Sequence, residues 1–123
     1  MTPAFLTDLV VKLIKDDTEE LWELVEPLTY RSMYKGCEFS VPVGFITNFC
    51  SVPRIPIIYD ILGNRARRAG TVHDYIYSVK MFPRIDCDIM LKEMVKLCGV
   101  NEFEREQFFI AVRAEGASHY GTK

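Results

Sequence analysis

The sequence lacks the features that would place it in a specialised class of protein. Its four cysteines show no C-x-x-C spacing, which argues against a zinc site, and no secretory leader accompanies them to suggest a disulfide framework. No apolar run approaches the ~20 residues that a membrane-spanning helix needs. Internal repeats, low-complexity tracts and linker-like stretches are also missing. We therefore expect a single domain, residues 1–123, that folds in a reducing cytoplasm.

The balance of charged residues limits the kinds of partner that the protein can bind. Fifteen basic residues stand against seventeen acidic ones, which gives a net charge of −2. Binding to nucleic acid depends on neutralising phosphates, so we expect no nucleic-acid partner. The one small basic cluster, at Arg65, Arg67 and Arg68, fits a solvated helix face. Apolar residues make up 49% of the chain, which is enough for a real hydrophobic core.

The residue pattern predicts strands in the first half and helices in the second. Short β-branched or alternating segments predict strands at 9–14, 21–30 and 37–41, although a helix over 5–15 is an alternative for the first. Pro27 places the second strand at an edge or at a break. Starts at Asn64, Pro83 and Asn101 predict three helices, the second ending at Gly99. The expected fold is α+β: a small N-terminal antiparallel sheet packed against three C-terminal helices.

Between these halves, residues 42–56 contain four breakers of secondary structure, three prolines and a glycine. Large hydrophobic residues alternate there with small polar ones, which indicates an ordered, partly buried loop. Its polar residues either satisfy backbone groups or line a pocket above the helices; they are Thr47, Asn48, Ser51 and Arg54.

Two of the predicted helices carry the residues most suited to catalysis. His73 and Tyr77 are four residues apart and share a helix face. In an antiparallel helical hairpin, residues equally far from the turn face each other, so we expect His73 beside Asp88. A carboxylate fixes the tautomer of an imidazole and prepares it to take a proton from water. Asp86 points away from this pair, and Asp74 projects where it could hold a cation or pair with an arginine.

The same residues have a purely structural interpretation. A His–Asp pair between packed helices is often a satisfied buried contact, and Tyr77 fits a core position equally well. Spacing alone favours this interpretation. Arg113 and His119 are predicted to be a surface charge and a tail residue.

Several motifs in this order resemble a phage and prophage family, domain of unknown function 1353. They are G-F-I-T-N-F-C-S-V-P-R at 44–54, H-D-Y-I-Y at 73–77, Arg84-x-x-x-Asp88, and A-V-R-x-x-G at 111–116. The resemblance spans about residues 9–120 and implies a phage-encoded protein, but no established activity. The family usually has Asp where this chain has Asn48. An amide cannot act as a base or give a divalent cation a full charge, so a reaction that used this position would be weakened.

The H-D-x-x-Y motif, followed on the next helix by an Asp, is also similar to the core of phospholipases A2. That resemblance implies that His73 activates water, Asp74 holds calcium and Asp88 orients His73, with Tyr77 in support. The chain has no glycine-rich calcium-binding loop. The expectation is thus no cofactor, with calcium as the alternative.

Two functions follow from these patterns. The leading hypothesis is a virion structural protein, tail or portal-proximal, made in the host cytoplasm, that contacts other virion proteins, with a homo-oligomer as a further option. The alternative is an envelope-directed hydrolase that cleaves a lipid ester or peptidoglycan with a His–Asp-activated water, with Arg84 in the pocket beside the pair. A small host-directed regulator is a third possibility.

Overall fold

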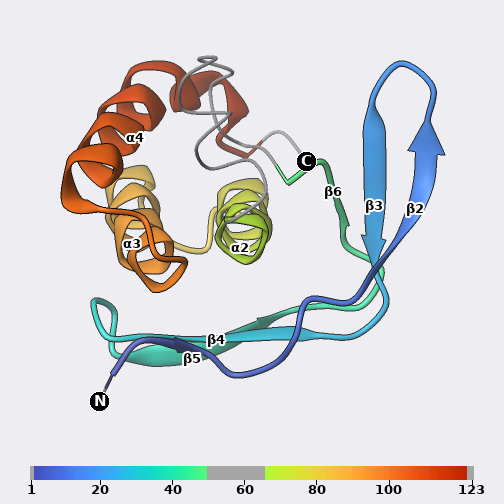
Figure 1. Ribbon diagram of the computed structural model, residues 1–123, viewed down its shortest axis with the longest axis horizontal. Helices are drawn as coiled ribbons and strands as arrows, with labels where there is room; N and C mark the ends of the chain where they lie inside the picture. Colours follow the sequence, from blue (N-terminus) through green and yellow to red (C-terminus); the bar gives the residue numbers. More distant parts are fainter. Residues whose placement is uncertain (1, 50–65, 122–123) are drawn as a thin grey trace.

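The computed structural model describes residues 2–49 and 66–121 of the chain. In these parts the strands precede the helices, so the predicted α+β class is confirmed (Figure 1). Ser51, Arg54 and the expected helix start at Asn64 lie outside the described residues. The described parts contain no helix long and apolar enough to cross a membrane.

The described strands are β1 (Ala4–Phe5), β2 (Val11–Asp16), β3 (Glu20–Leu24), β4 (Leu28–Ser32), β5 (Cys37–Val41) and β6 (Ile46–Thr47). The helices are α2 (Arg67–Ser78), α3 (Arg84–Leu97) and α4 (Glu102–Glu115), and a 3₁₀ turn, η1 (Gly116–His119), follows. The first strand segment therefore forms a strand, not a helix, and it is shifted by two residues from the predicted 9–14.

The strands form two sheets where one was predicted. Strands β1, β4 and β5 make one antiparallel sheet in the order β1-β4-β5, and β2, β3 and β6 make a second in the order β2-β3-β6. The division falls at Pro27, between β3 and β4, because proline has no N–H to continue a ladder. Figure 1 shows β4 and β5 running beneath the helices while the β2–β3 hairpin projects away from them.

The core lies between the first sheet and the helices. Strand β4 alternates as a half-buried strand should, with Leu28 and Tyr30 fully buried on the face toward the helices. Helices α2 and α3 present Ile76 and Met90 to the same core, and both are fully buried. Each such side chain contributes about 1.5–3 kcal/mol when it is removed from water. The phenol of Tyr30 also donates a hydrogen bond to Glu93 on α3, which ties the sheet to that helix.

The ends of α3 and α4 follow the sequence signals. The side chain of Asn101 accepts a hydrogen bond of 2.8 Å from the backbone N–H of Glu104, as an N-cap residue does. Helix α3 begins after Pro83, and Gly99 follows its end with a φ of 83°, in the left-handed region where glycine carries no steric penalty. These ends set the lengths of α3 and α4.

Candidate functional site

The predicted contact between His73 and Asp88 is present. Nε2 of His73 on α2 lies 3.0 Å from Oδ1 of Asp88 on α3. Neither residue carries exposed side-chain surface. The antiparallel hairpin of α2 and α3 thus brings together two residues fifteen positions apart in the chain.

Asp88 is the centre of the cluster. The phenol of Tyr77 donates a hydrogen bond of 2.5 Å to the same Oδ1, and its ring lies 4.2 Å, centroid to centroid, from that of His73. Nη1 of Arg113 on α4 donates to the other oxygen, Oδ2, at 2.8 Å. Both oxygens of the carboxylate are therefore held, each in a fixed direction.

These donors determine the ionisation of Asp88. Burial by itself raises the pKa of a carboxyl group, but the hydrogen bonds from His73, Tyr77 and Arg113 outweigh it, and the pKa of Asp88 is lowered from 3.8. The pKa of Tyr77 is raised, first by burial and then by its hydrogen bond to Asp88. At neutral pH the carboxylate is ionised and the phenol keeps its proton.

The ionised carboxylate selects one tautomer of His73. It has no proton to donate, so the Nε2 that it contacts must carry the hydrogen. In a neutral ring the lone pair is then on Nδ1. In this tautomer Nδ1 is the ring atom that can accept a hydrogen bond.

Arg113 was predicted to be a surface charge, and that prediction is wrong. Its backbone is near the end of α4, and its side chain turns back to Asp88 with only 32% of its surface exposed. Position 113 cannot be assigned from helical periodicity, because the contact depends on how α4 packs on α3. The sequence signal that could have indicated this contact is the arginine of the A-V-R-x-x-G motif.

The glycine of that motif serves the same cluster. A Cβ on Gly116 would lie 2.8 Å from the hydroxyl oxygen of Tyr77 and 3.3 Å from Nη1 of Arg84. A side chain at this position would displace the phenol from Asp88. Gly116 is part of the A-V-R-x-x-G motif, but only the packing of the end of α4 against Tyr77 gives it this role.

Arg84, expected to line a pocket beside the pair, lies at the start of α3 next to Asp88. Its Nη1 is 3.8 Å from Oδ2 of Asp88, and its guanidinium donates to the backbone carbonyls of Val112 and Arg113. A cation at these carbonyls also suits the negative end of the α4 dipole. Arg84 therefore links the carboxylate to the C-terminal turn of α4.

The loop before the helices is fixed through backbone contacts. Thr47 is fully buried, and its hydroxyl accepts a hydrogen bond of 2.9 Å from the N–H of Phe49. Phe49 has a φ of 65°, in a region that bulky residues seldom adopt, and its carbonyl oxygen lies against Gly70 of α2. Thr47 therefore satisfies the backbone, the first of its two predicted roles, and its place in a pocket stays a prediction; Asn48 is half-buried beside it.

Two further acidic residues of the helices, Asp74 and Asp86, were singled out from the sequence. Asp86 points away, as predicted, and accepts hydrogen bonds from Tyr34 and Lys35. Asp74 is buried on α2. In the part of the chain that the structure describes, no group of three His, Cys, Asp or Glu side chains could hold a metal ion. Calcium binding at Asp74 stays a prediction.

The fold and the buried carboxylate–histidine cluster together describe a small α+β protein organised around one ionised aspartate. Residues 22–112 match the family described as "Protein of unknown function (DUF1353)", and the chain belongs to that family. The match includes His73, Tyr77 and Asp88, and it confirms the family resemblance of the motifs. A search of curated proteins and a search of solved structures each found no match to the chain. The phage origin and the similarity to phospholipases A2 stay predictions.

Proposed function

We propose that the protein is a hydrolase in which His73, oriented by Asp88, activates a water molecule against an ester bond of a cell-envelope lipid. The observation that carries the proposal is the hydrogen bond between Nε2 of His73 and the ionised Asp88. It supports this chemistry because it leaves the basic lone pair of a neutral ring on Nδ1. The phage origin suggested by the family motifs supports the substrate, because a phage must breach an envelope.

In the proposed reaction Nδ1 of His73 takes a proton from water as the water oxygen bonds to the ester carbonyl carbon. The resulting tetrahedral adduct then breaks its bond to the alkoxide. The alkoxide receives the proton held by His73, so the products are a carboxylic acid and an alcohol, and the imidazole is restored. No redox step and no external proton carrier are required.

The neighbours of Asp88 have distinct roles in this proposal. Asp88 stabilises the imidazolium that forms when Nδ1 is protonated. Tyr77 and Arg113 hold the two carboxylate oxygens, so that Asp88 keeps its direction toward His73. His73, Tyr77 and Asp88 are buried, and a site from which bulk water is excluded strengthens these electrostatic interactions. Turnover also requires the ester to reach His73, whose side chain carries no exposed surface.

The experiment measures release of fatty acid from phosphatidylglycerol and phosphatidylethanolamine vesicles, with purified peptidoglycan as a second substrate. His73→Gln should abolish turnover, and Asp88→Asn should lower kcat by a factor of ~10² or more. Asp86→Asn is the matched control, because Asp86 lies on the same helix and faces away from His73. Wild type and Asp86→Asn should be equally active, with and without a calcium chelator.

The proposal fails if neither lipid nor peptidoglycan is hydrolysed by the folded wild-type protein. It also fails if His73→Gln retains the wild-type rate while its fold is intact by circular dichroism. Turnover that disappears with the chelator would instead assign a metal to the reaction and overturn the metal-independent mechanism.

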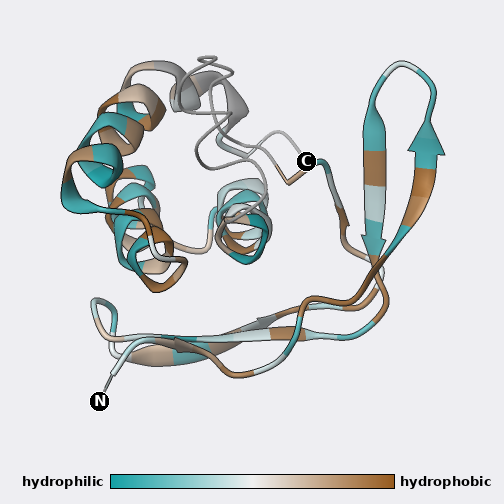
Figure 2. Cartoon of the chain, in the orientation of Figure 1, coloured by the Kyte–Doolittle hydropathy of each residue, from teal (hydrophilic) through white to brown (hydrophobic). Residues whose placement is uncertain are grey.

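A second function, a virion protein that makes protein contacts, is favoured by the surface of the second sheet. Leu13, Ile14 and Ile46 of this sheet each expose 42% of their surface, and the neighbouring Val25 exposes 45%. Figure 2 shows hydrophobic segments on the β2–β3 hairpin, away from the helices. Mass spectrometry of purified phage particles tests this function: the protein should be present in stoichiometric amounts, and its absence from particles would exclude a virion role.

A further inference from the structure

Helix α4 carries apolar side chains on two faces. Phe108, Ala111 and Val112 face the core and are buried. On the outer face Phe103 exposes 72% of its surface and Ile110 exposes 58%. A surface helix of a monomer normally presents an apolar face to the core and a polar face to water. The packing of a single chain therefore does not explain the apolar residues on the outer face of α4.

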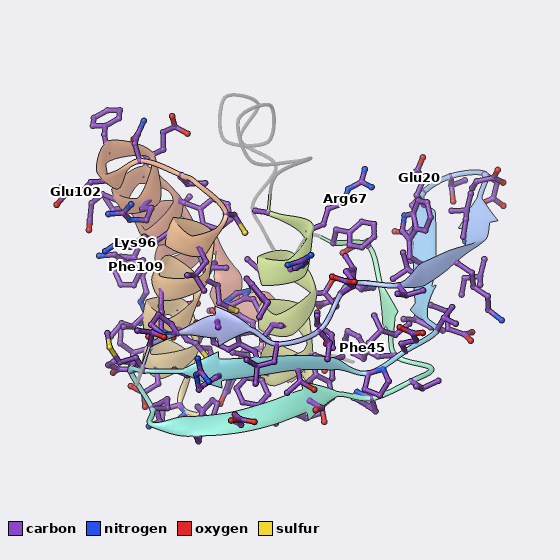
Figure 3. The ribbon with its side chains drawn as sticks, turned by 60° about the horizontal axis from the view of Figure 1, so that its bottom comes forward. Glu20, Phe45, Arg67, Lys96, Glu102 and Phe109 are labelled. Carbon is purple, nitrogen blue, oxygen red and sulfur yellow. The ribbon has the colours of Figure 1, made fainter. Side chains whose placement is uncertain are left out.

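The outer face of α4 forms a continuous stripe. It consists of four exposed residues separated by four, three and four positions: Phe103, Gln107, Ile110 and Ala114. We call these residues the α4 stripe. Their spacing keeps them on one side of the helix and is that of the seam of a coiled coil. Figure 3 shows the start of α4, marked by Glu102, at the opposite end of the molecule from the β2–β3 hairpin, marked by Glu20.

The α4 stripe is complementary to a second copy of itself. When two such helices pack antiparallel about a two-fold axis at their centre, Phe103 of each copy faces Ala114 of the other. Gln107 then faces Ile110. The largest side chain of the stripe thus meets the smallest, as in a well-packed core. A parallel pair would place Phe103 against Phe103 and would align the two helix dipoles unfavourably. The stripe therefore favours an antiparallel pair.

Gln107, the polar residue of the stripe, also fits a symmetric partner. Its side chain has no hydrogen-bond partner among the described residues. In the antiparallel pair the two copies of Gln107 lie on either side of the axis, offset by three residues or about 4.5 Å along the helix. An amide carries both donors and an acceptor, so the two side chains can satisfy each other. A single polar residue in an apolar seam fixes its register and orientation.

The charged residues beside the stripe are compatible with this packing. Glu106 forms an ion pair with Lys92, and Glu104 accepts a hydrogen bond from the side chain of Asn101. Arg113 is held by its hydrogen bond inside the buried cluster. Because these three side chains have partners in their own chain, a second copy can cover the stripe without leaving them unpaired.

We propose that the protein forms an antiparallel homodimer through the α4 stripe. One pair of helices, with two large apolar side chains from each copy, buries less than the roughly 1,600 Å² of a standard stable interface. The dimer is therefore weak, with a dissociation constant in the micromolar range or above, and it forms where the protein is concentrated. It does not depend on hydrolysis at His73.

Sedimentation equilibrium of the full chain, at concentrations from micromolar to millimolar, measures the association. The wild type should show a reversible monomer–dimer equilibrium, and Phe103→Asp and Ile110→Asp should each weaken it at least tenfold. Phe103 lies in the first turn of α4, where an acidic residue suits the helix dipole, so Phe103→Asp should fold normally. Val43→Asp is the matched control, because Val43 exposes the same 58% of its surface as Ile110 but lies between β5 and β6.

Cross-linking with a short bismaleimide measures the orientation of the pair. Gln107→Cys should be linked to position 107 of the second copy, because both positions lie close to the axis. Ala114→Cys should not be linked to its own counterpart, since the two are offset by eleven residues, about 16 Å along the helix. Peptide mass spectrometry separates these links from any that involve the native cysteines.

The proposal is overturned if the wild type stays monomeric over this range, which would leave the stripe to a different protein. It is also overturned if Phe103→Asp and Ile110→Asp associate like wild type, or if Val43→Asp is impaired as much as they are. Equal cross-linking at positions 107 and 114 would overturn the antiparallel arrangement. None of these measurements depends on turnover, so they are separate from the test of the hydrolase.

Discussion

Arg113 donates a hydrogen bond of 2.8 Å to Oδ2 of Asp88, across the interface of α4 and α3. The same carboxylate contacts His73 and Tyr77 of α2 through its other oxygen. One buried aspartate thus joins all three helices of the described chain. This arrangement makes Asp88 important for stability as well as for the proposed chemistry, and the two roles can be separated by experiment.

Replacement of Asp88 by alanine should destabilise the protein strongly. It leaves the buried phenol of Tyr77 and the imidazole of His73 without their acceptor, and an unsatisfied buried polar group costs about 1–3 kcal/mol. We expect the free energy of unfolding, measured by urea denaturation, to fall by about 3 kcal/mol. Asp86→Ala is the control and should have a clearly smaller effect, because its partners Tyr34 and Lys35 lie near the surface. Equal losses from the two variants would contradict the central role of Asp88.

The lowered pKa of Asp88 predicts a pH dependence of stability. Burial opposes the shift, but the hydrogen bonds from His73, Tyr77 and Arg113 outweigh it, so the folded-state pKa is below 3.8. The carboxylate therefore contributes stability that is fully present above that pH and is lost as the pH falls through the folded-state value. Urea denaturation between pH 5 and pH 2 should show a steeper loss in wild type than in Asp88→Asn. Parallel curves for the two proteins would rule out this contribution.

Gly70→Ala should destabilise the protein, although the same change in an exposed helix interior stabilises by about 1 kcal/mol. A Cβ on Gly70 would be 2.2 Å from the carbonyl oxygen of Phe49, which is backbone and cannot rotate away. The loop would have to leave α2, and we expect a lower melting temperature. A higher melting temperature would show that the close approach of Phe49 to α2 does not exist in solution.

Gly116→Ala tests the other close approach. The residue has helical φ and ψ angles of −73° and −17°, so the backbone itself would accept alanine. The new Cβ would nevertheless meet the hydroxyl oxygen of buried Tyr77 at 2.8 Å. We expect loss of stability and, because Tyr77 helps to hold Asp88, a reduced kcat in any assay that detects turnover. Unchanged stability together with unchanged kcat would argue against a role for the motif glycine in the cluster.

The cysteines should differ in reactivity. Cys87 is buried in α3, and burial, with a smaller effect of the nearby Asp88 charge, raises the pKa of its thiol to about 12. At pH 8 almost none of it is the reactive thiolate. Alkylation by iodoacetamide, followed by peptide mass spectrometry, should therefore modify the half-buried Cys37 much faster than Cys87. Similar rates under native conditions would contradict the packing of α3.

Local patterns predicted the elements of the fold because their causes are local. The alternation of Cys37–Val41 predicted β5 at its observed bounds, and Asn101 predicted the start of α4 through a side chain that caps its own helix. The contact between His73 and Asp88 was also predictable, since helical spacing and a short turn limit which residues can face each other in a hairpin. The split into two sheets at Pro27 was missed, because a proline marks a break without giving the direction in which the chain continues.

By itself, the sequence determined the α+β class, the cap of α4 and the pairing of His73 with Asp88, since each depends on residues near one another in the chain. Only the tertiary structure decided that Arg113 returns to Asp88 and that Gly116 makes room for Tyr77. It also decided that Phe103 and Ile110 stay exposed on α4 while Phe108 of the same helix is buried. These relationships depend on the angle and depth at which the helices pack, and such packing results from many side chains acting together.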